Sequence, residues 1–117
     1  MADKKYDLEA RLVEFVGNIV FFFKDMPNDR TGDYYGNQLL RSAGSAALNF
    51  GEAQGTNTQK DNINKLALSL KELKESRVNL RILGKVEYGE STKREHLLDE
   101  VEQLIKIIAT IIKNKKS

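Results

Sequence analysis

The chain has no cysteine and no tryptophan, and only one proline and one histidine stand among its 117 residues. Without cysteine it can form neither a disulfide framework nor a thiolate metal site. Carboxylate-bridged di-iron proteins need paired Glu-x-x-His motifs, whereas His96 is the sole histidine and has Lys93 three residues before it. We therefore expect no metal and no cofactor, and we interpret His96 as a surface residue.

Long apolar runs and phosphate-binding loops are also missing. The richest apolar runs, residues 19–23 and 104–112, fall short of the roughly 18 to 20 residues of a membrane span, and Lys106 interrupts the second. The glycines lack the spacing of a Walker or dinucleotide-binding loop and are interpreted as turns, caps and packing points: Gly32, Gly36, Gly44, Gly51 and Gly55.

An N-terminal secretory signal is not expected either. Charged side chains at positions 7, 9, 11 and 14 interrupt the apolar core that such a signal requires. The chain is therefore expected to be cytoplasmic, with no membrane partner. Its net charge of +2 is too small to indicate a nucleic-acid-binding protein by itself.

Four segments with helical periodicity are present, and three short breaks rich in turn-forming residues separate them. Pro27 ends the first segment, and Thr58 is suited to cap the third. The predicted fold class is all-α, a four-helix bundle in one domain spanning residues 1–117. We predict helices over residues 5–26, 34–53, 59–86 and 92–115.

Apolar residues form two rows in the first segment and two in the fourth. The main rows have the alternating three- and four-residue spacing of a bundle seam: Leu8, Leu12, Phe15, Ile19, Phe22 and Met26, and later Leu97, Val101, Leu104, Ile108 and Ile111. The flanking rows are Val13, Val16, Val20 and Phe23, and Leu98, Ile105 and Ile112. Because a monomeric bundle needs one apolar stripe per helix, the flanking rows predict a surface buried between subunits, and we expect a homo-oligomer.

The two middle segments are predicted to approach each other closely. The second has a run of small residues at positions 42–47, and the third has Ser69 and Ser76 within an otherwise leucine-rich seam. Small residues that face one another allow the axes of the two helices to lie closer than the usual distance of about 8 to 10 Å.

Polar residues also share one face of the second segment. Ser45, Asn49 and Glu52 follow a helical spacing, and Glu72 of the third segment can face them. A pair formed by Glu52 and Glu72 would offer an acid and a base, but no nucleophile, metal or set of oxyanion donors accompanies it. The favoured interpretation is a polar packing network that includes Arg41 and sets the register of the two helices.

The third segment carries a local basic surplus, with seven basic and three acidic residues between positions 60 and 85. Most of these cations fall within about 60° to 80° on a helical wheel. We name this set the basic stripe: Lys60, Lys71, Lys74, Arg77, Arg81 and Lys85. It is suited to a phosphate backbone but not to base recognition, because no aromatic residues interleave with it. The alternative is a solvated helix face.

Residues 35–43, with the sequence Tyr-Gly-Asn-Gln-Leu-Leu-Arg-Ser-Ala, carry a family resemblance together with Ser45, Asn49, Glu52 and the Lys-Glu-Leu at positions 71–73. They resemble the four-helix-bundle family of bacterial 23S rRNA intervening-sequence proteins, which includes relatives of Avd, the accessory protein of diversity-generating retroelements. The resemblance implies an antiparallel up-and-down bundle assembled as a homopentameric ring. For Avd-like members it also implies binding to nucleic acid and to a reverse transcriptase through a basic surface.

Two alternative functions are considered for this chain, and neither is enzymatic. The first is an oligomeric accessory that binds RNA, DNA or a ribonucleoprotein through the basic stripe. The alternative is a structural ring that binds a protein partner and no nucleic acid. The modest net charge and the Ser-Asn-Glu set differ from the Avd pattern, so the chain is placed with the members that have no assigned activity.

Overall fold

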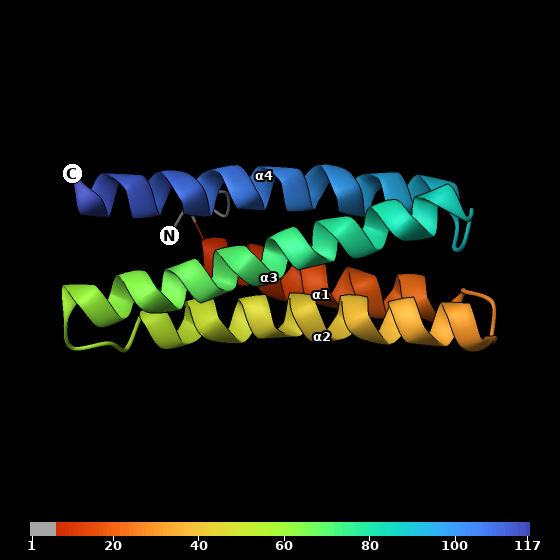
Figure 1. Cartoon of the computed structure of the whole chain (residues 1–117), viewed down its shortest axis with the longest axis horizontal. Helices are drawn as coiled ribbons and strands as arrows, with labels where there is room; N and C mark the ends of the chain where they lie inside the picture. Colours follow the sequence, from red (N-terminus) through yellow and green to blue (C-terminus); the bar gives the residue numbers. More distant parts are fainter. Residues whose placement is uncertain (1–6) are drawn as a thin grey trace.

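The computed structural model describes residues 7–117, which form four helices and no β-strand. The predicted all-α fold is therefore confirmed for this part of the chain. Successive helices connect at alternate ends of the molecule, and all four extend along its 44 Å axis (Figure 1). The helices are α1 (Leu8–Lys24), α2 (Arg30–Ala53), α3 (Gln59–Lys85) and α4 (Ser91–Lys116).

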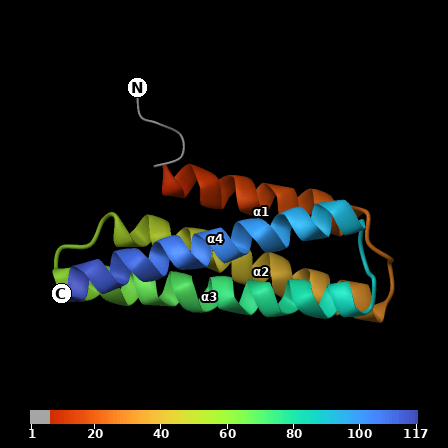
Figure 2. The same ribbon diagram turned by 90° about the horizontal axis from the view of Figure 1, so that it is seen from above.

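The helices surround one apolar core. Each helix packs against two others, in the order α1, α2, α3, α4 and back to α1, and the α2–α3 pair has the most extensive contact. Among the four described helices, α1 does not contact α3 and α2 does not contact α4, so each of these pairs lies diagonally across the core. Figure 2 shows α1 and α3 on opposite sides of α4.

The predicted main rows form the core. Leu12, Ile19 and Phe22 of α1 are fully buried, as are Leu104 and Ile108 of α4. The serine-containing seam of α3 is also buried along its length, from Leu66 to Leu83. Burial of the apolar faces of all four helices supplies the main driving force for this arrangement.

The side chains of the flanking rows differ in burial between α4 and α1. In α4, Ile105 is buried and Leu98 and Ile112 pack against the core of the same chain. This row is therefore at least partly covered within one chain, because a helix between two neighbours needs a wide apolar stripe to cover both. Its part in a contact between subunits stays a prediction. In α1, Phe23 also packs on the core, whereas Val13 is 61% exposed.

The first connection is shorter than predicted. The α2 helix begins at Arg30, four residues before the expected start at position 34, because Asp29 caps it. The Asp29 carboxylate accepts a hydrogen bond of 2.8 Å from the backbone N–H of Gly32, which satisfies a free donor of the first turn. The α1 helix ends at Lys24 rather than at residue 26, and its predicted start at residue 5 lies outside the described residues.

The connection between α3 and α4 closes the same end of the molecule. Tyr88 donates a hydrogen bond of 2.6 Å from its hydroxyl to the Asp29 carboxylate, which joins this loop to the α1–α2 loop. Gly89 has φ +84, and a Cβ atom there would lie 2.4 Å from the ring of Phe22. Only glycine fits this position, because it combines the left-handed backbone with close packing on the core.

Candidate functional site

Small side chains join α2 to α3. The hydroxyl oxygens of Ser42 and Ser76 lie 2.7 Å apart, and the Ser69 hydroxyl donates a hydrogen bond of 2.8 Å to the backbone oxygen of Ala46. All three serines have no exposed surface. These bonds satisfy each hydroxyl inside the contact, so the serines allow close approach without leaving a buried polar group unpaired.

The predicted polar packing network is divided along α2. Arg41 donates a hydrogen bond of 3.0 Å to Glu72 and forms a second ion pair with Glu75, so it links α2 to two carboxylates of α3. Glu72 is only 8% exposed, and this pairing compensates its charge. The Asn49 amide instead donates to the backbone and hydroxyl oxygens of Ser45, within α2 itself.

Glu52 is outside this network. It forms an ion pair of 2.8 Å with Lys65, and both side chains are substantially exposed. Because eleven residues separate it from Arg41, the two lie about 16 Å apart along the helix. The structure therefore does not bring Glu52 and Glu72 together, and the acid–base pair considered from the sequence has no shared site.

The basic stripe lies on the outer face of α3. Its exposed members are Lys60, Lys71, Lys74, Arg81 and Lys85. Within residues 7–117 none of these five forms an ion pair, in contrast to Arg11 of α1 and Arg41 of α2. Arg77 differs from them, because its guanidinium lies 3.6 Å from Glu102 and so faces α4. The stripe extends over about 37 Å at 1.5 Å per residue.

Apolar side chains interrupt the C-terminal part of the stripe. Val78 is 51% exposed, and it lines a surface hollow of about 430 Å³ with Ile82, Arg81 and Lys85. We call this the α3 hollow. It combines two cations with two apolar side chains, a composition that the charge pattern alone did not suggest.

A second hollow lies between α1 and α2. It has a volume of about 440 Å³ and is lined by Glu9, Val13, Ala47, Leu48, Gly51 and Glu52. We call this the α1–α2 groove. Leu48 is 69% exposed and was not singled out from the sequence, although it stands two residues from the buried Ala46 and Phe50 and so on the opposite face of α2.

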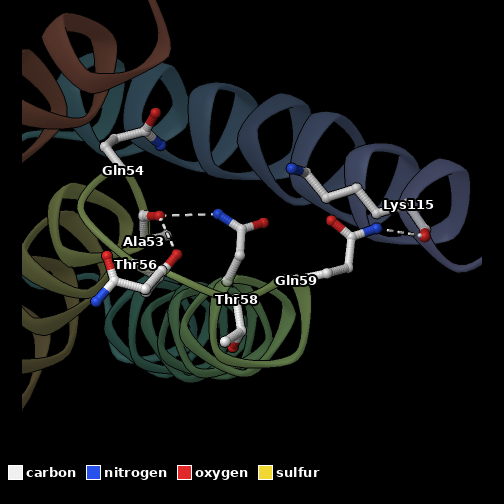
Figure 3. Close-up of a pocket in the computed structure, with 8 residues that line it drawn as sticks. Ala53, Gln54, Thr56, Thr58, Gln59 and Lys115 are labelled. Carbon is white, nitrogen blue, oxygen red and sulfur yellow. Dashed lines mark hydrogen bonds between the residues drawn. The ribbon is translucent and has the colours of Figure 1, made fainter.

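A polar hollow lies at the end of the bundle where α2 connects to α3 (Figure 3). Thr56 and Asn62 each donate a hydrogen bond of 2.8 Å to the backbone oxygen of Ala53. The Gln59 amide donates one of 3.0 Å to the backbone oxygen of Lys115. These bonds tie the start of α3 to the ends of α2 and α4, so the donors are already in use.

The hydrogen bond to Glu100 of α4 raises the pKa of Arg11, and three further shifted pKa values occur at loops and caps. The hydroxyl of Tyr88 and the backbone N–H of Gly32 lower the pKa of Asp29, and the same carboxylate raises the pKa of Tyr88. Backbone N–H groups of Lys93 and Thr92 lower the pKa of Glu90, the N-cap of α4. All three groups therefore stabilise helix starts and loops.

Within residues 7–117 no three side chains of the metal-binding types gather, and His96 is exposed. None of the helices in this part of the chain has an apolar stretch of the length that a membrane span needs.

Residues 4–110 match the family model described as 23S rRNA-intervening sequence protein. The chain belongs to this family. The resemblance found at residues 35–43 is thereby confirmed, and it extends over nearly the whole chain.

A solved structure has a similar fold. It is the crystal structure of a protein with unknown function from the S23 ribosomal protein family, from Bacteroides thetaiotaomicron VPI-5482. The two chains share 30% sequence identity with a TM-score of 0.83, and the match covers 91% of this chain and 98% of that one. No curated protein matches. Neither the name of the family nor that of the solved structure states an activity.

Proposed function

We propose that this protein is a non-catalytic accessory of the bacterial cytoplasm that binds the phosphate backbone of RNA or DNA, alone or within a ribonucleoprotein. In this proposal the chain is an antiparallel up-and-down bundle that assembles as a homopentameric ring. The basic stripe of α3 makes the nucleic-acid contact. No side chain of the chain is assigned a catalytic role.

The supporting observation is the row of exposed, unpaired cations on α3. Lys60, Lys71, Lys74, Arg81 and Lys85 lie along one helix face without carboxylate partners among the described residues. Each cation that neutralises a phosphate releases condensed counterions, which favours binding at low salt. A ring would repeat the row in every subunit, and multivalent contact would raise the overall affinity.

The same surface limits what can be recognised. The α3 helix contains no aromatic residue, so it offers no platform on which unpaired bases could stack. Lysine contacts to phosphate position a protein without reading base edges. Binding is therefore expected to depend on backbone charge and to be insensitive to sequence.

Fluorescence anisotropy with a labelled, structured RNA tests this proposal. The variant Lys71→Glu with Lys74→Glu is expected to weaken binding by about tenfold or more, because two attractive contacts become repulsive. The variant Lys106→Glu with Lys113→Glu makes the same change of charge on α4 and serves as the matched control. Equal loss of binding in both variants would mean that binding depends on net charge and not on the basic stripe. Unchanged binding in the α3 variant would reject the proposed contact between the stripe and nucleic acid.

A structural or protein-binding ring without nucleic acid is the second candidate. It is favoured by the exposed apolar side chains Val13, Phe21 and Leu48, which are 60% to 69% exposed. Contiguous exposed apolar surface marks protein contacts, and Val13 and Leu48 line one hollow. Affinity capture from the native cell would then recover a protein partner that nuclease treatment does not release.

A further inference from the structure

Two surface hollows of this chain have opposite charges around similar apolar centres. The α3 hollow places Arg81 and Lys85 beside Val78 and Ile82. The α1–α2 groove is a counterpart, with two carboxylates in place of the two cations. It places Glu9 and Glu52 beside Val13 and Leu48.

We propose that these hollows are the two halves of one subunit contact. The α3 hollow of one copy docks on the α1–α2 groove of the next copy, so that the cations meet the carboxylates and the valine and leucine side chains meet each other. This inference rests on the proposed ring and names the faces that build it.

The chemistry of each hollow favours a second copy as the occupant. A phosphate backbone would satisfy Arg81 and Lys85 but would leave the half-exposed Val78 in contact with polar groups. The groove would repel phosphate through Glu9 and Glu52, one of which, Glu52, is only partly compensated by Lys65. Complementary charge around an apolar centre is the usual arrangement of a specific protein contact.

The position of the hollows indicates how copies would assemble. Val78 stands two residues from the buried Ser76 and Leu80, so it points away from the core. The groove includes α1, which lies across the core from α3 (Figure 2). A contact between two different faces is heterologous, and it leaves each copy with one face for a further neighbour. Repetition of such a contact closes a ring or extends a chain of subunits.

The basic stripe would then be divided between two tasks. Arg81 and Lys85 lie at the C-terminal end of α3 and would be covered by the neighbouring subunit. Lys60, Lys71 and Lys74 lie outside the α3 hollow and would stay available to phosphate. Assembly and nucleic-acid binding therefore depend on different cations of one helix.

A charge-reversal cycle tests the contact, with mass measured by light scattering after size exclusion at several protein concentrations. The α3 variant is Arg81→Glu with Lys85→Glu, and the groove variant is Glu9→Lys with Glu52→Lys. Each alone is expected to weaken assembly by about tenfold or more, because like charges would face each other. The combination of all four changes in one chain is expected to restore assembly, since the charges are again opposite.

Matched controls carry the same charge changes elsewhere. Lys106→Glu with Lys113→Glu matches the α3 variant, and Glu14→Lys with Glu95→Lys matches the groove variant. All four control positions are exposed and lie outside both hollows. Circular dichroism verifies that every variant remains helical. The controls are expected to assemble like the unaltered chain.

The possible results separate this contact from the proposed function. If the α3 and groove variants keep the mass of the unaltered oligomer, or if the combined variant stays dissociated, the assignment of faces is overturned while the ring itself stands. If the unaltered protein is a monomer at every concentration, both the ring and this contact are overturned. Loss of RNA binding in the variant Lys71→Glu with Lys74→Glu, with assembly intact, supports the division of the stripe.

Discussion

Ser42 and Ser76 show how single polar residues determine the spacing of two helices. Their hydroxyls share a hydrogen bond in the middle of the α2–α3 contact, and Ser76 also donates to the backbone oxygen of Glu72. A leucine at either position would match the apolar pattern of a bundle but would need space that the contact does not provide. The small volume of serine and its satisfied hydroxyl both matter here.

Substitution of Ser76 tests this interpretation. Ser76→Ala is expected to lower the free energy of unfolding by about 1 kcal/mol, because the Ser42 hydroxyl loses a buried partner. Ser76→Leu is expected to lower it by about 1 to 3 kcal/mol through overpacking. Urea unfolding measures both values. A Ser76→Leu protein as stable as the unaltered chain would show that the helices are not in close contact here.

The hydrogen bond between Tyr88 and Asp29 predicts how stability depends on pH. The pKa of Asp29 is lowered in the folded chain, so its contribution is present above the ordinary carboxyl pKa of about 4 and is lost as the pH falls through the lowered value. The pKa of Tyr88 is raised, so its contribution is present below the ordinary tyrosine pKa of about 10 and is lost as the pH rises through the raised value.

Tyr88→Phe removes this bond at both ends of the pH range. The melting temperature of the variant is expected to fall less steeply in acid and in alkali than that of the unaltered chain. Part of the acid dependence should remain, because Glu90 also has a lowered pKa and keeps its backbone donors. Thermal melts across this range measure the effect, and identical profiles for the two proteins would contradict the role of the bond.

Within the α2 element, two glycines have opposite reasons to be present. A Cβ atom at Gly32 would lie 2.3 Å from the backbone oxygen of Pro27, where the chain folds back after α1. A Cβ atom at Gly44 would have no neighbour within 4 Å. The first glycine is required by packing, and the second only lowers helix propensity.

Alanine substitutions at these two positions form a matched pair. Gly44→Ala is expected to stabilise the protein by about 0.5 to 1 kcal/mol through helix propensity. Gly32→Ala is expected to destabilise it by about 1 to 3 kcal/mol, because the loop backbone must move. Chemical denaturation of both variants compares them directly. Destabilisation by both would mean that Gly44 has a contact absent from the isolated chain.

The sequence predicted the elements better than their ends and side-chain partners. Apolar spacing located the buried rows of α1 and α4, because burial repeats with the helical period. The start of α2 was wrong by four residues, since Asp29 caps a turn that looked like loop. The pairing of Glu52 with Lys65 depends on the register of α3 against α2, and the spacing of residues within one helix does not specify that register.

The candidate site was predicted only in outline. A helical wheel grouped five cations on one face of α3, and all five are exposed, whereas Arg77, which it placed beside them, pairs with Glu102 of α4. The wheel also could not show that Ile105 is covered by neighbouring helices while Leu48 is left exposed. Those outcomes depend on the position of each helix among its neighbours, which only the packed structure reveals.

For the whole molecule, the described surface combines a cationic helix face with exposed apolar side chains on α1 and α2. Leu48 and Val13 are left in solvent in the single chain, and five cations of α3 have no carboxylate partner among residues 7–117. A ring that covers the apolar groups and presents Lys60, Lys71 and Lys74 of every subunit together would use both features.

The mass of the purified protein, measured by light scattering during size exclusion with absorbance recorded at 260 and 280 nm, tests the proposed ring most directly. We predict about five times the 13.3 kDa of one chain, with excess absorbance at 260 nm from bound nucleic acid that high salt removes. The same mass without that absorbance would favour the protein-binding ring. A monomer of 13.3 kDa at every concentration would contradict the ring and the function built on it.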